Sequence, residues 1–207
     1  ARINSFELAY RMQTDAREAF DIAGEKPETV AKYGANAQGR QMLIARRLLE
    51  RGVRFVQVRQ GGWDLHGGIA QRAANNARQL DPAIGAIMDD LKERGLFEDT
   101  LIYITSEFGR SPTEDGGGGR SHNARGLSTV LMGGGIKGGI AYGSTDEIGG
   151  AAVENKVHVK DIHATVMDLL GFDHEQLTYR TAGRDFRLTQ ATRSLPQGGM
   201  PVKGIIA

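Results

Sequence analysis

The sequence contains no cysteine among its 207 residues. This absence excludes disulfides, zinc sites with thiolate ligands and any nucleophile derived from cysteine within the chain. No apolar run approaches the roughly 18 residues that a membrane-spanning helix needs, and the opening residues do not resemble a signal peptide. The sequence also has no large excess of charge of one sign, because 26 Lys and Arg residues accompany 25 Asp and Glu residues. The resulting net charge of +1 argues against nucleic-acid binding, which typically uses a basic stripe.

Glycine, by contrast, is abundant, with 29 of 207 residues. The length suits one sizeable domain, and we expect a single domain over residues 1–207. The chain starts with Ala1 inside a helical pattern, so we expect a fragment or a processed chain. Glycine and proline near the end predict a poorly ordered tail over residues 190–207.

Apolar periodicity predicts helices that alternate with strands. Helices are expected at the start of the chain, with Ile3, Phe6 and Tyr10 on one face, over 41–51, around the stripe Leu80, Ile84, Ile87 and Leu91, and over 161–170. Strands are expected over 53–58, 101–105 and 128–132. This order predicts an α/β fold with a mostly parallel sheet and helices on both faces.

Polar residues lie at the ends of these predicted strands. Asp64 and His66 follow the first strand, Glu107 follows the second, and His122 precedes the third. Ligands of open α/β sheets bind outside the carboxyl ends of the strands, so we expect these four residues to share one site. Two carboxylates and two imidazoles suit zinc, manganese or another divalent ion. Each residue also has a plainer interpretation, since Asp64 suits a turn or a helix cap and the histidines suit solvated loops.

Arg110 and Arg120 are candidate anion contacts, because a guanidinium group matches tetrahedral oxyanions and carboxylates. Both could equally be ordinary surface arginines. Gly116 to Gly119 form no phosphate-binding loop, since no Gly-Lys-Ser/Thr follows, and are interpreted as a mobile flap over the site. Three further histidines are expected to be structural: His158, His163 and His174.

Seven long, ordered segments carry a resemblance to a known family. They are GRQMLIARRLLERGVRFVQV (39–58), GGWDLHG (61–67), RGLFEDTLIYITSEFGRSP (94–112), GRSHN (119–123), GGGIKGG (133–139), VENKVHVKDIHATVMDLLG (153–171) and GRDFRLT (183–189). Nearly the whole chain resembles the bacterial sulfatase-like domain of unknown function 1501, which is related to the alkaline phosphatase superfamily.

The resemblance implies an alkaline-phosphatase-like fold and a metal-dependent hydrolase of sulfate or phosphate esters. Asp64 and His66 resemble the superfamily's Asp/His ligand pair, Glu107 its acidic ligand and His122 its late histidine ligand. Zinc, manganese or calcium is the implied ion, and a small anionic ester, held by Arg110 or Arg120, is the implied substrate. Export to the periplasm or outside the cell is implied as well.

Two positions depart from the family pattern. Phe108 stands where a second ligand histidine is usual, and Ser121 stands where relatives have an acidic residue. The resemblance implies that the attacking residue lies in an N-terminal part of the fold, which we expect to be absent from this chain, and the family supports neither Thr105 nor Ser106 in its place. The catalytic nucleophile is therefore unknown.

Two hypotheses remain open on sequence alone. One is a hydrolase that has little or no activity as this chain, and the other is a non-catalytic binding or surface protein that retains the fold. A sheet without its N-terminal strands would have a bare or unusually paired edge, so we also expect possible pairing with a second copy in a homo-oligomer.

Overall fold

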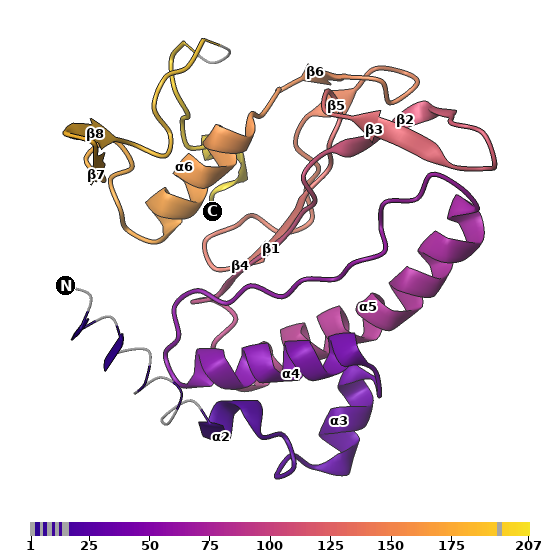
Figure 1. Cartoon of the computed structure of the whole chain (residues 1–207), viewed down its shortest axis with the longest axis vertical. Helices are drawn as coiled ribbons and strands as arrows, with labels where there is room; N and C mark the ends of the chain where they lie inside the picture. The colour runs from indigo at the N-terminus through magenta and orange to yellow at the C-terminus, as the bar shows by residue number, and fades with distance from the viewer. Residues whose placement is uncertain (1–2, 5, 8–9, 11–12, 14–16, 194–195) are drawn as a thin grey trace. The chain divides into compact units, whose positions relative to one another are not determined.

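The computed structural model describes residues 3–4, 6–7, 10, 13, 17–193 and 196–207 (Figure 1). The sequence predicts a single domain, whereas the contacts within the structure divide into two compact units. The first unit comprises the described residues up to Leu96 together with Asp115–Arg120. The second comprises Phe97–Glu114 and Ser121–Ala207.

The first unit is helical in the part that the structure describes. Its helices with assigned bounds are α2 (Arg17–Phe20), α3 (Pro27–Tyr33), α4 (Ala37–Glu50) and α5 (Ile69–Glu93). The side chain of Asn36 caps α4 by accepting a hydrogen bond from Gly39 N at 2.9 Å. Helices α4 and α5 lie side by side (Figure 1), and α3 packs against both.

The predicted apolar stripe of the third helix lies on α5 and faces the core at its C-terminal half. Ile87 is 5% exposed and Leu91 is fully buried, and each such burial contributes about 1.5–3 kcal/mol. The predicted end near Arg94–Gly95 is also confirmed, because α5 ends at Glu93 and Gly95 adopts a positive φ of 66°. Hydrophobic periodicity therefore located this helix correctly.

At the start of the chain, the described residues 3, 4, 6, 7, 10 and 13 are helical, as expected. Their apolar stripe is exposed, however, with Ile3, Phe6 and Tyr10 at 73%, 75% and 69%. The apolar periodicity therefore predicted a helix correctly, but its apolar residues are not buried.

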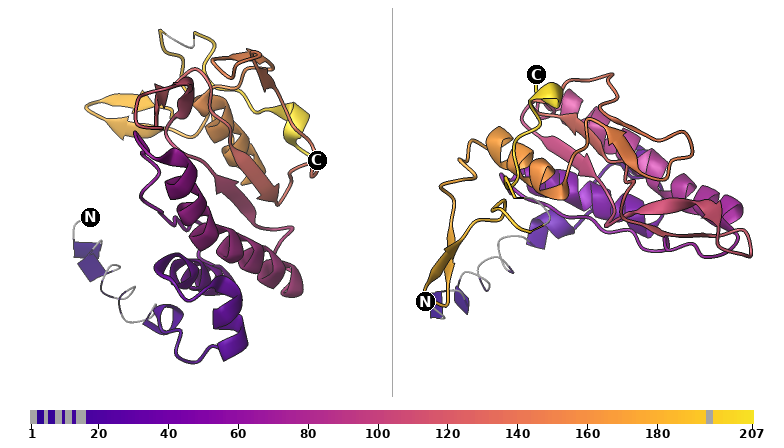
Figure 2. Two further views of the ribbon diagram at one scale, coloured as in Figure 1. Left: turned by 90° about the vertical axis from the view of Figure 1, so that its right-hand side faces the viewer. Right: turned by 90° about the horizontal axis from the view of Figure 1, so that it is seen from above.

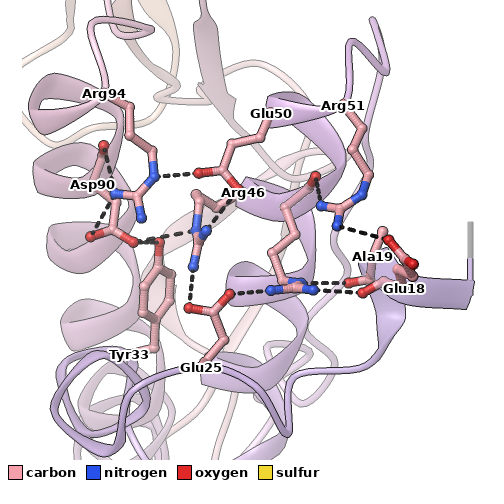
Figure 3. Close-up of polar contacts among 10 residues, drawn as sticks. Glu18, Ala19, Glu25, Tyr33, Arg46, Glu50, Arg51, Asp90 and Arg94 are labelled. Carbon is pink, nitrogen blue, oxygen red and sulfur yellow. Dashed lines mark hydrogen bonds and ion pairs between the residues drawn. The ribbon is translucent and has the colours of Figure 1, made fainter.

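A cluster of charged side chains connects α4 to α5 and to the loop before α3 (Figure 3). Arg46, whose side chain is 3% exposed, donates Nη2 to Glu25 and Nη1 to Glu50, each at 2.7 Å. Its Nε lies 3.4 Å from Asp90 Oδ2, which also accepts a hydrogen bond from the Tyr33 hydroxyl at 3.0 Å. Buried charges persist only when they are paired. The cluster therefore fixes these elements in one arrangement.

We expect Glu25 to make the first unit sensitive to acid. Burial raises the pKa of its carboxyl, but hydrogen bonds from Arg47 and Arg46, with the charges of both, outweigh burial and hold the pKa below the ordinary 4.5. A lowered carboxyl pKa contributes stability that is fully present above the unfolded-state pKa and is lost as pH falls through the folded-state pKa.

The measurement is urea unfolding of the unaltered chain and of Glu25→Gln between pH 7 and pH 3. Glu25→Gln should be the less stable protein at pH 7, and the difference should shrink below about pH 4.5. Glu28→Gln, a change at an exposed position on α3, serves as the control and should show no such trend. A difference for Glu25→Gln that stays constant with pH would contradict the prediction.

The second unit combines short strands with one longer helix. Its elements are β1 (Leu101–Ile104), β2 (Gly109–Glu114), β3 (Arg120–Asn123, beginning at the unit boundary), β4 (Val130–Gly133), β5 (Ser144–Thr145), β6 (Ala152–Glu154), α6 (Val159–Leu169), β7 (Tyr179–Thr181), β8 (Arg184–Phe186) and the 3₁₀ turn η1 (Lys203–Ile205). Helix α6 buries Ile162, Ala164 and Met167. Strands β7 and β8 form an antiparallel hairpin (Figure 2), and the residues of both strands are exposed.

The predicted mostly parallel sheet, and with it the alkaline-phosphatase-like fold, is wrong. Strands β1 and β4 coincide with two predicted strands but pair antiparallel, with Leu101 opposite Gly133 and Ile104 opposite Val130. Parallel strands need a crossover connection, usually a helix. Residues 105–129, which connect β1 to β4, carry the paired strands β2 and β3 instead. Every sheet among the described residues has two strands, so β1 and β4 each keep an outer edge without a strand partner. The predicted bare edge referred to a larger parallel sheet, so these edges do not test it.

The predicted strand over 53–58 is extended chain that forms no ladder with any described strand. Val56 and Val58 are half-buried and Phe55 is 78% exposed. Strand-forming residue types favour an extended backbone, but a strand also requires a neighbour that completes its hydrogen bonds. The strand predicted over 53–58 is therefore wrong, because this segment pairs with no described strand.

The described C-terminal residues contact α6, where the sequence predicts a poorly ordered tail over 190–207. Val202 and Ile205 are only 8% and 7% exposed. The backbone N–H of Val202 donates to Thr165 Oγ1 at 2.9 Å, and Lys203 Nζ lies 3.0 Å from Asp168 Oδ2. Two apolar side chains, Val202 and Ile205, thus attach the end of the chain to the rest of the unit. The high glycine and proline content of this segment gave no indication of that contact.

Candidate metal centre

Asp64 and His66 lie in the extended segment that leads into α5. Leu65 between them is 2% exposed, whereas both polar neighbours are exposed. The buried Leu65 anchors the segment, and its two polar neighbours both face the solvent. His66 Nε2 lies 3.0 Å from Asp64 Oδ1. The structure thus brings these two predicted ligands together.

His66 has a second carboxylate partner that was not singled out from the sequence. Asp115 Oδ2 lies 3.0 Å from His66 Nδ1, so the imidazole ring lies between two carboxylates. The hydrogen bond to Asp115 is the largest influence on the pKa of His66, and the Asp64 charge adds to it; together they outweigh desolvation and raise the pKa above the ordinary 6.5. The imidazole therefore keeps its second proton to higher pH than a solvated histidine.

Asp115 is the first residue of a glycine-rich loop, residues 115–120, which we call the flap. Backbone hydrogen bonds attach the flap to the chain around His66: Gly68 N donates to Gly117 O at 2.9 Å, and Arg120 N donates to Leu65 O at 3.1 Å. Gly116, Gly117 and Gly118 all have positive φ, between 55° and 76°, which favours glycine at each position. The glycine run is thus hydrogen-bonded to the chain around His66, and its mobility over a site stays a prediction.

The other two predicted ligands, Glu107 and His122, belong to the second unit and are both exposed. The ring of His122 packs on Phe108, with ring centroids 4.2 Å apart and an angle of 32° between the planes. The resemblance leads us to expect a ligand histidine at position 108, and the structure shows that the phenylalanine there packs its ring against His122. Glu107 and His122 stay predictions from the sequence as metal ligands.

The candidate anion contacts differ in their surroundings. In the second unit, the Arg110 guanidinium carbon lies 5.8 Å from the centroid of the Phe108 ring, a cation–π distance. In the first unit, Arg120 continues the flap directly after Gly119 and is half-buried. Arg110 thus contacts the ring that packs on His122, and the backbone of Arg120 contacts Leu65, the residue between Asp64 and His66.

The two hydroxyl groups near Glu107 form local hydrogen bonds. Thr105 Oγ1 donates to Ser106 O at 3.0 Å, and Ser106 Oγ donates to Phe108 O at 2.9 Å. A nucleophilic hydroxyl is usually bonded to a general base instead. This geometry gives no support to either residue as the missing nucleophile.

Two of the remaining histidines have structural contacts of the kind expected. His158 caps α6: its side-chain Nδ1 accepts a hydrogen bond from Lys160 N at 3.2 Å, and its backbone N–H donates to Asp161 Oδ2 at 2.7 Å. His174 Nδ1 lies 2.9 Å from the hydroxyl of the buried Thr189. These contacts account for both residues without a ligand.

Residues 1–197 match the family described as protein of unknown function DUF1501, and the chain belongs to this family. No curated protein and no solved structure matches the chain significantly. Among the described residues, no helix combines the length and the apolar character that crossing a membrane requires. Family membership confirms the predicted resemblance at the level of the domain of unknown function.

Proposed function

We propose that this chain carries part of the metal site of a sulfatase-like, metal-dependent hydrolase of sulfate or phosphate esters. The observation that supports this most is the Asp64–His66 pair, whose facing oxygen and nitrogen atoms are 3.0 Å apart. Two donor atoms that each lie about 2.1 Å from one ion are about 3.0 Å apart at the right angle of an octahedral ion and about 3.4 Å apart at the tetrahedral angle of zinc. The pair therefore has the spacing of two neighbouring ligands of a single cation.

The donor types narrow the choice of ion. Imidazole nitrogen with carboxylate oxygen suits zinc or manganese, whereas calcium prefers oxygen ligands throughout. When bound, such an ion polarises the ester oxygen and stabilises charge on the leaving group. Asp64 and His66 would hold the ion, Glu107 and His122 are proposed as its further ligands, and Arg110 or Arg120 would bind the anionic group of a small ester substrate.

A second candidate is a non-catalytic binding protein of the same family. The ring of Phe108 against His122, where a further ligand is usual, and the locally bonded hydroxyls of Thr105 and Ser106 favour it. A stoichiometric bound ion supports the first candidate, and protein that binds no ion supports the second.

The test is calorimetric titration of residues 1–207 with zinc, manganese and calcium, together with turnover of aryl phosphates and aryl sulfates. We expect weak binding of one divalent ion and little or no turnover, because loss of a nucleophile removes most of the rate in comparable sites. Glu107→Gln should weaken binding further, since an amide of the same size removes one negative charge. Robust turnover that survives Glu107→Gln would show that the chemistry lies elsewhere in the chain.

A further inference from the structure

We propose that Asp115 is a positioning residue for His66: its carboxylate accepts the Nδ1 proton and thereby turns Nε2 toward a cation shared with Asp64. This inference rests on the proposed function. It adds to that function a residue 49 positions away in sequence, on a loop that sequence patterns present only as flexible.

The first support is the geometry around the imidazole. The Nδ1 and Nε2 atoms of His66 each lie 3.0 Å from a carboxylate oxygen, of Asp115 and Asp64 respectively. A neutral imidazole carries one proton, and the nitrogen without it is the one that binds a metal. In the structure both ring nitrogens face a carboxylate, which suits a ring that carries a proton on each. A cation between Nε2 and Asp64 would take the place of the Nε2 proton, and the ionised Asp115, which can only accept, would keep the other proton on Nδ1.

The second support is the way the flap holds Asp115 in place. Two hydrogen bonds join consecutive residues of the two segments: Gly68 N to Gly117 O at 2.9 Å and Ile69 N to Gly118 O at 3.0 Å. Within the flap, Asp115 N donates to Gly119 O at 3.1 Å. The backbone of Asp115 is thus tied to the same segment that carries His66, so the contact between their side chains does not depend on two independent loops.

The third support is chemical. Metal-bound histidines commonly donate their other ring N–H to a carboxylate, which fixes the ring orientation and makes the nitrogen a stronger ligand. Asp115 also adds a second negative charge next to the imidazole, which attracts a cation. Both effects act on the metal through His66, so Asp115 needs no bond to the ion.

The experiment compares the unaltered chain with Asp115→Ala and Asp115→Asn. Asparagine retains an acceptor oxygen without the charge, and Asp81→Ala, an exposed acidic position on α5, controls for loss of one negative charge in the same unit. Zinc affinity is measured by calorimetry. The tautomer of His66 is read from long-range ¹H–¹⁵N spectra of the zinc-loaded protein, with the His66 signals assigned from a His66→Gln variant.

We expect Asp115→Ala to lower zinc affinity by about 10–100-fold, Asp115→Asn to lower it less, and Asp81→Ala to leave it nearly unchanged. The spectra should show a protonated Nδ1 in the unaltered chain and in Asp115→Asn, and loss of that single tautomer in Asp115→Ala. Hydrogen exchange at the Gly68 and Ile69 amides reports whether the flap stays attached.

The outcomes separate this inference from the function on which it rests. If the unaltered chain binds no zinc, the proposed function fails and this inference fails with it. If zinc binds but Asp115→Ala changes neither affinity nor tautomer, only this inference is overturned. Equal losses in Asp115→Ala and Asp115→Asn with exposed Gly68 and Ile69 amides would also overturn it, because Asp115 would then merely close the flap.

Discussion

Replacing Arg46 by methionine is expected to lower the free energy of unfolding by about 3–5 kcal/mol. Methionine retains the apolar stem of Arg46, so the loss reports the charged group. The change leaves the side chain of Asp90, only 5% exposed, and that of Glu25, 11% exposed, without their shared cation. Arg47 still pairs with Glu25. Among the described residues, however, Asp90 keeps only Arg94, at 3.6 Å, and the Tyr33 hydroxyl. A buried carboxylate that loses its central cation is costly, whereas the intact pair contributes little beyond a well-packed apolar substitute.

The measurement is urea unfolding followed by circular dichroism at pH 7. Lys32→Ala provides the matched control, because Lys32 lies 3.6 Å from Glu93 on the surface, with exposed fractions of 51% and 62%. An exposed pair of this kind contributes about 0.2–1 kcal/mol. If Arg46→Met cost no more than Lys32→Ala, the cluster would behave as solvated surface charge, and its proposed role in joining α3, α4 and α5 would be wrong.

Replacing Gly119 by alanine is expected to detach the flap from the segment that carries His66. A Cβ at Gly119 would lie 2.0 Å from the carbonyl carbon of His66 and 2.4 Å from Gly67 N, both backbone atoms that cannot rotate away. Forcing extra atoms into such a contact typically costs about 1–3 kcal/mol. The affected hydrogen bonds run from Gly68 N and Ile69 N, so the amides of these residues should lose protection from hydrogen exchange.

Zinc affinity should fall in Gly119→Ala at least as far as in Asp115→Ala, because detachment removes Asp115 from His66. Gly85→Ala is the control glycine variant: it lies inside α5 with nothing within 4 Å of a built Cβ, and should stabilise the helix by about 0.5–1 kcal/mol. Unchanged exchange at Gly68 and Ile69 in Gly119→Ala would contradict this account of the flap.

The helices were predictable because their apolar residues recur with the helical period and their side chains pack locally. Ile87 and Leu91 illustrate this on α5, as do Leu43 and Ala45 on α4. Strand pairing was not predictable in the same way. The direction of the β1–β4 pair depends on whether residues 105–129 form a helix or a hairpin. This glycine-rich segment has no apolar periodicity that predicts either structure.

The site was predictable to the same limited extent. Asp64 and His66 are two residues apart, so any extended backbone places them on one side. Asp115 comes from 49 residues further on, and the signal that could have found it is its position as an acidic residue opening a run of four glycines. Likewise, Arg46 lies three residues after the buried Leu43 on α4, which places it on the inward face. A charge on an inward face indicates a buried partner.

The extended segment before α5 has a consequence for aggregation. Phe55 to Val58 combine aromatic and β-branched residues in a backbone that is already extended and forms no ladder with a described strand. Such stretches template the stacking of identical chains into cross-β assemblies. Arg54 and Arg59 flank the stretch on both sides, and stacking copies in register would bring these like charges together every ~4.7–4.8 Å. We therefore expect the two arginines to act as gatekeepers that oppose stacking of this short segment.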